Sequence, residues 1–289
     1  TKRGDTLPDA PTLPEPVAVR WGERGPAIAA GLAEPPPLDL TLRDPADTAQ
    51  WAVQLSADSL MPGHLRLPRG ANVEKLPGFG EGAWWVQDIA ASLPARLLGP
   101  GEGRHVLDLC AAPGGKTLQL AAQGWQVTAL DISKRRLDLL KANLKRTGLK
   151  AGAVRADALK WEPKHTFDAI LLDAPCTATG TARRHPDVLH RIGPQTIEQM
   201  AQLQAALLQR AQGWLKPGGT LVYATCSLER AEGEDQAGAV SLTPDPITRD
   251  GLPQGVEPGS AGWLRTDPGM LEEHGGLDGF FIARWRRDL

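Results

Sequence analysis

The chain has 289 residues, of which 41% are hydrophobic and 23% charged, so it can bury a large core and need not be disordered. Its formal net charge of −2 excludes a uniformly basic nucleic-acid-binding protein, although it permits local clusters of Lys and Arg. The sequence contains no apolar run of about 18 residues, the length needed to span a bilayer. Residues 1–15 hold prolines and charges where a signal peptide needs an apolar stretch. We therefore expect a cytoplasmic protein without a membrane partner. Because residue 1 is threonine, we also expect the natural chain to begin upstream.

The first part of the chain is rich in proline, at residues 7–16 and again at 35–37, as is typical of linkers. Mixed polar and apolar stretches such as residues 51–60 indicate a small α+β segment, although their periodicity is weak. We therefore expect an α+β segment over residues 1–72 and place the start of a larger domain at residue 73.

From His105 onward, short apolar runs alternate with amphipathic segments, which is the pattern of a parallel sheet with crossover helices. We expect strands at 105–110, 126–131, 151–156, 167–173 and 219–225. We expect helices at 117–123, 133–147 and 194–214. A strand over 278–285 is expected to be antiparallel at the sheet edge, and residues 241–262, rich in Pro and Gly, are expected to form a long loop.

The segment Asp108-Leu-Cys-Ala-Ala-Pro-Gly-Gly-Lys-Thr117 follows the first strand and leads into a helix. It therefore lies at the carboxyl edge of the sheet, where doubly wound folds bind ligands. Gly114 and Gly115 let the backbone approach a ligand closely. The final Gly-Lys-Thr matches a phosphate-binding loop, but Cys110 stands where that pattern requires glycine. No Gly-x-Gly-x-x-Gly occurs in this loop, which disfavours a nicotinamide cofactor.

Aspartates close three successive strands, namely Asp131, Asp157 and Asp173. Together with Asp108 they predict a ring of carboxylates around one crevice. S-adenosylmethionine would suit such a ring, because carboxylates satisfy its ribose hydroxyls, its adenine amine and its cationic tail. Any one of these aspartates alone is more often a helix cap or a turn residue. An interpretation as caps or turn residues must account for all four aspartates.

Three cysteines, Cys110, Cys176 and Cys226, are too few and too far apart for a disulfide framework, and none belongs to a Cys-x-x-Cys zinc pattern. We expect reduced thiols and no metal. Cys176 and Cys226 follow the fourth and fifth strands, so both reach the carboxyl edge of the sheet. A lone cysteine after a strand is more often an inert buried residue. Two beside a cofactor crevice favour chemistry at carbon 5 of cytosine, which needs a thiolate to add at carbon 6. The residues alone do not rank the two.

These segments resemble the motifs of the Nop/Sun family of RNA cytosine carbon-5 methyltransferases, particularly its bacterial Sun or Fmu branch, which modifies small-subunit ribosomal RNA. Beyond the loop and the cysteine motifs, the resemblance covers residues 76–79, 86–88, 184–187 and 278–281. It implies a Rossmann-like, S-adenosylmethionine-dependent methyltransferase domain over residues 73–289. Members of the branch commonly begin with a helical RNA-binding domain related to the antitermination factor NusB, which we do not find, so the choice of ribosomal site stays open.

The resemblance also implies roles for individual residues. Cys226 is expected to attack carbon 6 of a cytosine in ribosomal RNA, with 16S rRNA as the expected substrate, and Cys176 to assist release of the methylated RNA. The residues expected to bind S-adenosylmethionine are Cys110, Ala111, Ala112, Pro113, Gly114, Gly115, Lys116, Asp131, Asp157 and Asp173. The alternatives are methylation of transfer RNA or another RNA, or a ribosome-assembly protein that has lost activity.

For RNA contact we favour Arg183 and Arg184, because they follow Cys176 closely and basic side chains attract phosphates. The cluster at residues 134–136 is expected to face solvent. Trp84 and Trp85 could stack on unpaired bases, but we expect them to serve core packing. The target cytosine must leave any base stack to reach a catalytic thiol, so we expect a loop or an opened helix as the substrate.

Overall fold

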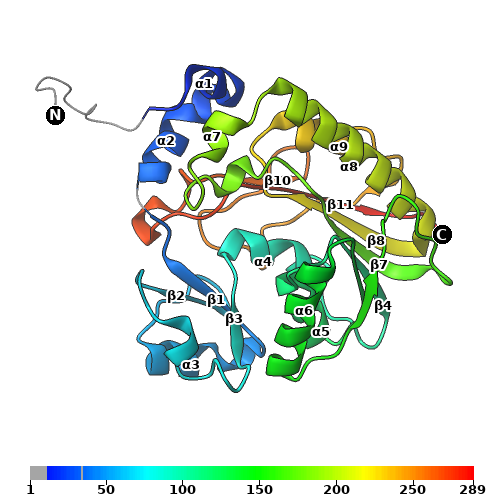
Figure 1. Ribbon diagram of the computed structural model, residues 1–289, viewed down its shortest axis with the longest axis horizontal. Coiled ribbons are helices and arrows are strands. Elements are labelled where there is room, and N and C mark those ends of the chain that lie inside the picture. Colours follow the sequence, from blue (N-terminus) through cyan, green and yellow to red (C-terminus); the bar gives the residue numbers. More distant parts are fainter. Residues whose placement is uncertain (1–11, 34) are drawn as a thin grey trace, which may run out of the picture.

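The computed structural model describes residues 12–33 and 35–289 (Figure 1). The first proline-rich stretch lies partly outside these residues. Its described end is not a linker, because Glu15 and Pro16 begin helix α1 (Glu15–Trp21), where proline is favoured in the first turn. Residues 35–37 do connect helix α2 (Gly25–Ala33) to strand β1 (Leu38–Leu42), as expected.

A small antiparallel sheet follows the two N-terminal helices. Strand β1 pairs on one side with β2 (His64–Leu67) and on the other with β3 (Trp84–Val86), and α3 (Thr48–Leu55) precedes β2. Trp84 is fully buried in this unit and Trp85 is 3% exposed, which confirms that both tryptophans serve packing. Because β3 lies beyond residue 72, the small sheet extends past the expected domain boundary, and a division at that residue stays a prediction.

The larger sheet has the order β10-β11-β8-β7-β4-β5-β6, with the two-residue β9 pairing with β11. Strands β4 to β8 are parallel, as the alternating pattern predicted. Their bounds are β4 (His105–Leu109), β5 (Gln126–Asp131), β6 (Gly152–Arg155), β7 (Phe167–Asp173) and β8 (Leu215–Thr225). The remaining strands are β9 (Thr243–Pro244), β10 (Leu264–Thr266) and β11 (Phe280–Arg286).

Helices cover both faces of this sheet (Figure 1). They are α4 (Ile89–Arg96), α5 (Gly115–Ala122) and α6 (Lys134–Thr147) on one face, and α8 (Pro194–Trp214) and α9 (Glu234–Ala237) on the other. The short helix α7 (Val188–Arg191) lies beside α1 and α2 instead. Successive strand residues alternate between two cores: Val106 and Leu171 pack with α4 to α6, whereas Leu107 and Leu172 pack with α8. This two-sided burial explains why the strands are continuous apolar runs.

The final strand was predicted only in part. Strand β11 is antiparallel to β8, as expected. It is not at the sheet edge, because β10 and β9 pair with its other side. Both of these strands are very short, and β9 and β10 lie within or just after the Pro- and Gly-rich stretch, where composition predicted only a loop.

The part of the chain that the structure describes also contains six single-turn 3₁₀ helices: η1 (Gly22–Arg24), η2 (Pro45–Asp47), η3 (Val73–Lys75), η4 (Thr179–Thr181), η5 (Arg230–Glu232) and η6 (Glu272–His274). The N-terminal helices pack against the segment that follows β8. Val17, Trp21 and Ile28 form a small apolar cluster with Leu228, and Trp21 Nε1 donates a hydrogen bond to Glu229 at 3.2 Å. Within the described ranges, no helix combines the length and the apolar character that crossing a bilayer would require.

Candidate active site at the carboxyl edge of the sheet

A pocket opens beyond the carboxyl ends of β4, β5, β6 and β7. Two of its lining residues are aspartates, Asp131 at the end of β5 and Asp157 just after β6, and two are exposed apolar side chains, Ile132 and Leu159. The complete lining is Cys110, Leu130, Asp131, Ile132, Arg136, Ala156, Asp157, Ala158, Leu159, Pro175, Leu203 and Leu207. The pocket therefore offers carboxylates beside an apolar wall, at the edge where the sequence placed a ligand.

The loop between β4 and α5 has a conformation that depends on its glycine. Gly114 has a φ of +113°, and a Cβ atom added there would lie 2.9 Å from Leu140 Cγ. Only glycine fits that combination of positive φ and close packing. Ala112 N donates a hydrogen bond to Asp131 Oδ2 at 3.1 Å, which ties the loop to the end of β5. Of the loop residues expected to bind a ligand, Cys110 lines the pocket, and a role for residues 111–116 stays a prediction.

The strand-end aspartates serve local turns and line the pocket at the same time. Asp131 accepts a hydrogen bond from Ser133 N at 2.8 Å, and Asp157 accepts one from Leu159 N at 2.9 Å. The side chain of Asp157 is nevertheless 34% exposed. The cap interpretation and the ligand interpretation of these residues are therefore compatible, because a carboxylate has several lone pairs to share.

Arg136 also lines the pocket, although we expected the basic cluster at residues 134–136 to face solvent. Its guanidinium donates to Ala112 O, and its Nη1 lies 3.7 Å from Asp131 Oδ2. Lys134 behaves as expected, because it pairs with Asp138 on the exposed face of α6. Arg136 could have been singled out by helical spacing, because it lies in the first turn of the helix that follows Asp131.

Asp173 and Lys116 form an ion pair beside this pocket, with Asp173 Oδ2 2.8 Å from Lys116 Nζ. The ammonium also lies 5.2 Å from the centroid of the Phe280 ring, within the range of a cation–π contact. Asp108 differs from the other aspartates. It is fully buried and accepts a hydrogen bond from Thr117 Oγ1 at 2.5 Å, whereas the side chain of Asp173 is 31% exposed, although neither residue lines the pocket. The expectation that Asp108 completes the ring of carboxylates is therefore wrong.

The two cysteines at the ends of β7 and β8 meet. Cys176 Sγ and Cys226 Sγ are 3.4 Å apart, and both residues are partly exposed. The hydrogen bond with Cys226 and burial hold the pKa of Cys176 well above its usual range, so Cys176 stays a thiol. Cys110 lines the pocket and is not paired with these two cysteines. Burial and the neighbouring Asp173 and Asp131 raise the pKa of Cys110 to about 12.

Hydroxyl groups beside the cysteines connect the two loops, and they are not among the residues predicted from the sequence. Thr177 and Ser227, which directly follow the cysteines, are 3.1 Å apart at their Oγ atoms. The backbone adds Gly180 N, which donates to Cys226 O at 3.0 Å. A Cβ atom at Gly180 would lie 2.0 Å from Gly279 O, so this crossing of loops requires glycine. The repeated Cys-Thr and Cys-Ser pattern was the available signal.

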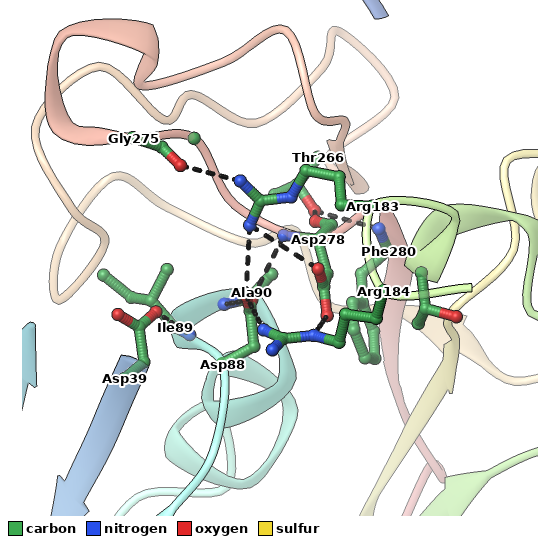
Figure 2. Close-up of polar contacts among 12 residues, drawn as sticks. Asp39, Asp88, Ile89, Ala90, Arg183, Arg184, Thr266, Gly275, Asp278 and Phe280 are labelled. Atoms are coloured by element: carbon green, nitrogen blue, oxygen red, sulfur yellow. Dashed lines mark hydrogen bonds and ion pairs between the residues drawn. The ribbon is translucent and has the colours of Figure 1, made fainter. Parts of the chain in front are cut away.

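Arg183 and Arg184 lie in a cluster of charges with Asp88 and Asp278 (Figure 2). The Arg183 side chain is only 1% exposed, its Nη1 donates to Gly275 O at 2.7 Å, and its Nη2 lies 3.6 Å from each aspartate. The expectation that Arg183 contacts RNA is therefore wrong, because its charge is buried and paired. Arg184 donates to the same two aspartates at 3.0 and 3.1 Å, but its side chain remains 33% exposed.

Across residues 12–33 and 35–289, no three His, Cys, Asp or Glu side chains lie close enough together to hold a metal ion.

A family model described as 16S rRNA methyltransferase RsmB/F matches residues 95–286. Ribosomal RNA small subunit methyltransferase B of Klebsiella pneumoniae is 41% identical over 280 residues, which cover 91% of this chain and 62% of that protein. The Salmonella typhi protein of the same name is 44% identical over 233 residues, covering 77% of this chain and 51% of that protein. The chain thus spans about half to three fifths of the length of these relatives.

Two solved structures are also similar. A methyltransferase homologue from Pyrococcus horikoshii has a TM-score of 0.79 and 28% identity, covering 95% of both chains. NSun6 from Pyrococcus horikoshii, solved with SFG, has a TM-score of 0.65 and 32% identity, covering 77% of this chain and 58% of that one. These likenesses confirm the Rossmann-like methyltransferase fold, and the family match confirms the resemblance drawn from the motifs. The chain belongs to the RsmB/F family of 16S rRNA methyltransferases.

Proposed function

We propose that this protein transfers a methyl group from S-adenosylmethionine to carbon 5 of a cytosine in small-subunit ribosomal RNA, with Cys226 as the nucleophile. The observation that carries the proposal is the 3.4 Å separation of Cys226 Sγ and Cys176 Sγ at neighbouring strand ends, with Pro175 lining the adjoining pocket. The names of the relatives, ribosomal RNA small subunit methyltransferase B, support ribosomal RNA as the substrate class. Such a substrate would place the protein in the cytoplasm.

The pocket suits the methyl donor. Asp131 and Asp157 offer acceptors for ribose hydroxyls and an adenine amine, and the exposed side chains of Ile132 and Leu159 offer an apolar surface for the adenine ring. Asp173 offers a carboxylate for a cationic group. When bound, S-adenosylmethionine supplies an electrophilic methyl group. The proposed donor-binding residues are Cys110, Ala111, Ala112, Pro113, Gly114, Gly115, Lys116, Asp131, Asp157 and Asp173.

The cysteines would divide the chemistry between them. Carbon 5 of cytosine becomes nucleophilic only after the Cys226 thiolate bonds to carbon 6. After methylation, a base removes the proton on carbon 5, and the electrons of that C–H bond expel the Cys226 sulfur from carbon 6. The Cys176 thiol, held in its protonated form, can donate a hydrogen bond to the departing Cys226 sulfur. This division agrees with the expected roles, in which Cys226 attacks carbon 6 and Cys176 assists release of the methylated RNA.

The assignment of the cysteines is tested by comparing Cys226→Ser and Cys176→Ser with ribosomal RNA and donor on a denaturing gel. We expect no covalent complex from Cys226→Ser, and a complex that accumulates with Cys176→Ser because release is slowed. If Cys226→Ser still forms the complex and Cys176→Ser cannot, the assignment is reversed.

The substrate is tested separately. We expect radiolabelled methyl groups to enter small-subunit ribosomal RNA when the protein is incubated with total RNA. Labelling of transfer RNA alone, or of no RNA, would reject this substrate. Mapping of 5-methylcytosine in ribosomal RNA from a strain without the protein would then identify the nucleotide. Among the two arginines first considered for RNA contact, Arg184 keeps that proposed role because part of its side chain is exposed.

A further inference from the structure

A buried glutamate lies behind the two cysteine-bearing loops. Glu232, at the end of η5, has no exposed surface. Its carboxylate accepts hydrogen bonds from Thr177 N at 3.0 Å and from Thr177 Oγ1 at 2.6 Å. Gln204 Nε2 lies 3.5 Å away and also donates to Pro175 O at 2.8 Å. The glutamate thereby bonds directly to the residue that follows Cys176, and Gln204 connects it to the residue that precedes Cys176.

The same glutamate is connected to the loop that carries Cys226. Thr177 Oγ1, which bonds to the carboxylate, lies 3.1 Å from Ser227 Oγ, and Ser227 directly follows Cys226. The backbone carbonyl of Glu232 accepts hydrogen bonds from Tyr223 OH at 2.7 Å and from Thr225 Oγ1 at 3.2 Å. Thr225 directly precedes Cys226. Glu232 is therefore bonded to segments flanking both thiols.

The chemistry of this position calls for a carboxylate. Its partners, Thr177 N, Thr177 Oγ1 and Gln204 Nε2, are all donors or can act as donors, and an ionised carboxylate only accepts. An amide of the same shape would turn an NH₂ group toward one of these donors and leave a buried group unpaired. Burial raises the pKa of Glu232, while hydrogen bonds from Ser227 and Thr177 oppose that shift.

We propose that Glu232 is a positioning residue, whose buried carboxylate fixes the loops after β7 and β8 so that the Cys176 thiol stays hydrogen-bonded to Cys226. This inference rests on the proposed roles of the two cysteines. Glu232 touches neither the pocket nor the sulfur atoms, and acts through Thr177 and Ser227. Its charge also contributes, after Cys226 and burial, to raising the pKa of Cys176. Without it, the thiol that assists release would lose its place and part of the effect that keeps it protonated.

The test compares Glu232→Gln with Glu229→Gln in the full chain. Glu229 is a matched control, because it is also buried, at 3% exposed, and lies three residues away, yet its carboxylate bonds to Arg20 and Trp21 of α1. Formation and decay of the RNA–protein complex are followed after rapid quenching. Loss of one charge-assisted hydrogen bond should slow release by about 10-fold or more while formation changes by less than about 3-fold. Glu229→Gln should alter neither rate.

Equal slowing of formation and release, or the same change with Glu229→Gln, would overturn the proposal, because that is what general loss of structure produces. If Glu232→Gln does not fold, Thr177→Val carries the test. It removes the hydroxyl that joins Glu232 to Ser227 and keeps the shape of the side chain. The same selective slowing of release is expected from it, and unchanged release would overturn the proposal.

A measurement without RNA separates this inference from the proposed function. The free protein is alkylated with iodoacetamide at one pH, and labelling of Cys176 and Cys226 is followed by peptide mass spectrometry. Because the thiolate is the reactive form and the charge of Glu232 helps to raise the pKa of Cys176, Glu232→Gln should label Cys176 several-fold faster relative to Cys226 than the unmodified protein does. Unchanged relative labelling would reject the role of Glu232 even if RNA methylation is established. A shift in labelling without any RNA methylation would reject the proposed function alone.

Discussion

Aspartates in two regions of the molecule look alike in the sequence and differ in the structure. Asp131 ends β5 and Asp157 follows β6 beside the pocket, and their hydrogen-bond donors are backbone N–H groups. Asp88 and Asp278 instead meet Arg183 and Arg184 in the interior (Figure 2). The first pair lines the pocket and has its nearest cations, Arg136 and Lys160, at 3.7 and 3.9 Å. In the second pair, both aspartates accept hydrogen bonds from the Arg184 guanidinium at 3.0 and 3.1 Å. A place in the pocket lining, rather than the presence of a nearby cation, therefore separates the proposed binding residues from the structural ones.

The interior cluster joins segments that are far apart in the chain. Asp88 caps the start of α4, Arg183 and Arg184 follow the Cys176 loop, and Asp278 precedes β11. Asp39 of the small sheet accepts a hydrogen bond from Ile89 N at 3.0 Å, directly beside Asp88. The cluster thus fixes the loop that carries Cys176 against both the small sheet and the large one, which is a structural task rather than RNA contact.

The largest effect is expected when this cluster loses its buried cation. Arg183→Met leaves two buried carboxylates without their full counter-charge, which typically costs about 3–5 kcal/mol of unfolding free energy. Urea unfolding followed by circular dichroism measures this loss. Arg184→Met is the matched control and should cost less, because its side chain is 33% exposed. If Arg183→Met is as stable as the unmodified protein but binds RNA more weakly, Arg183 contacts RNA after all.

The second effect is a pH dependence that arises in the interior. Burial raises the pKa of Asp108 from 3.8 to about 7. Because this folded-state pKa lies above the unfolded value, the native state binds the proton more tightly, and stability falls as pH rises between these values. Between pH 5 and pH 7 the contribution should fall by roughly 2 kcal/mol. Asp108→Asn should flatten this part of the stability curve, and an unchanged slope would show that Asp108 is not its source.

The sequence predicted the elements whose signals are local. Strands β5 and β7 and helix α8 have the predicted bounds, because aspartate ends each of the two apolar runs and Gly193-Pro194 marks the start of the helix. The strand-end residues also converge as predicted, because parallel strands bring their carboxyl ends to one edge. Strand β10 was missed, because three residues are too few to show an alternating pattern.

Contacts between distant segments could not be predicted in this way. The interpretation of Arg183 was wrong because its partners, Asp88 and Asp278, are more than 90 positions away in the sequence. Glu232 was missed because its carboxylate reaches Thr177 only after η5 folds back beneath β8. Asp108 sits in the same motif as the pocket loop, and only packing shows that its side chain points into the core. Motif membership alone does not separate these roles.

The third effect concerns the ion pair between Asp173 and Lys116. Asp173→Asn removes the charge that holds Lys116 at 2.8 Å, and kcat/KM for methyl transfer should fall about 30-fold, or about 2 kcal/mol for a charge-assisted hydrogen bond. Asp168→Asn is the matched control, because Asp168 also lies on β7 and pairs with Lys216 at 2.8 Å, near the opposite end of the strand. Recovery of the rate with saturating donor would mean that Asp173 binds the donor. A rate that stays low would point to the target base, and an unchanged rate would remove Asp173 from the site.

The smallest effect tests the pocket side of the comparison most directly. Asp157→Asn keeps the shape of the side chain and an oxygen for the hydrogen bond from Leu159 N, so the turn should survive. Donor affinity, measured by isothermal titration calorimetry, should weaken about 5-fold, since one partly exposed hydrogen bond contributes about 1 kcal/mol. Unfolding free energy should stay the same, in contrast to Arg183→Met. If stability falls and affinity does not, Asp157 only caps its turn, and the distinction between pocket and interior aspartates fails at this residue.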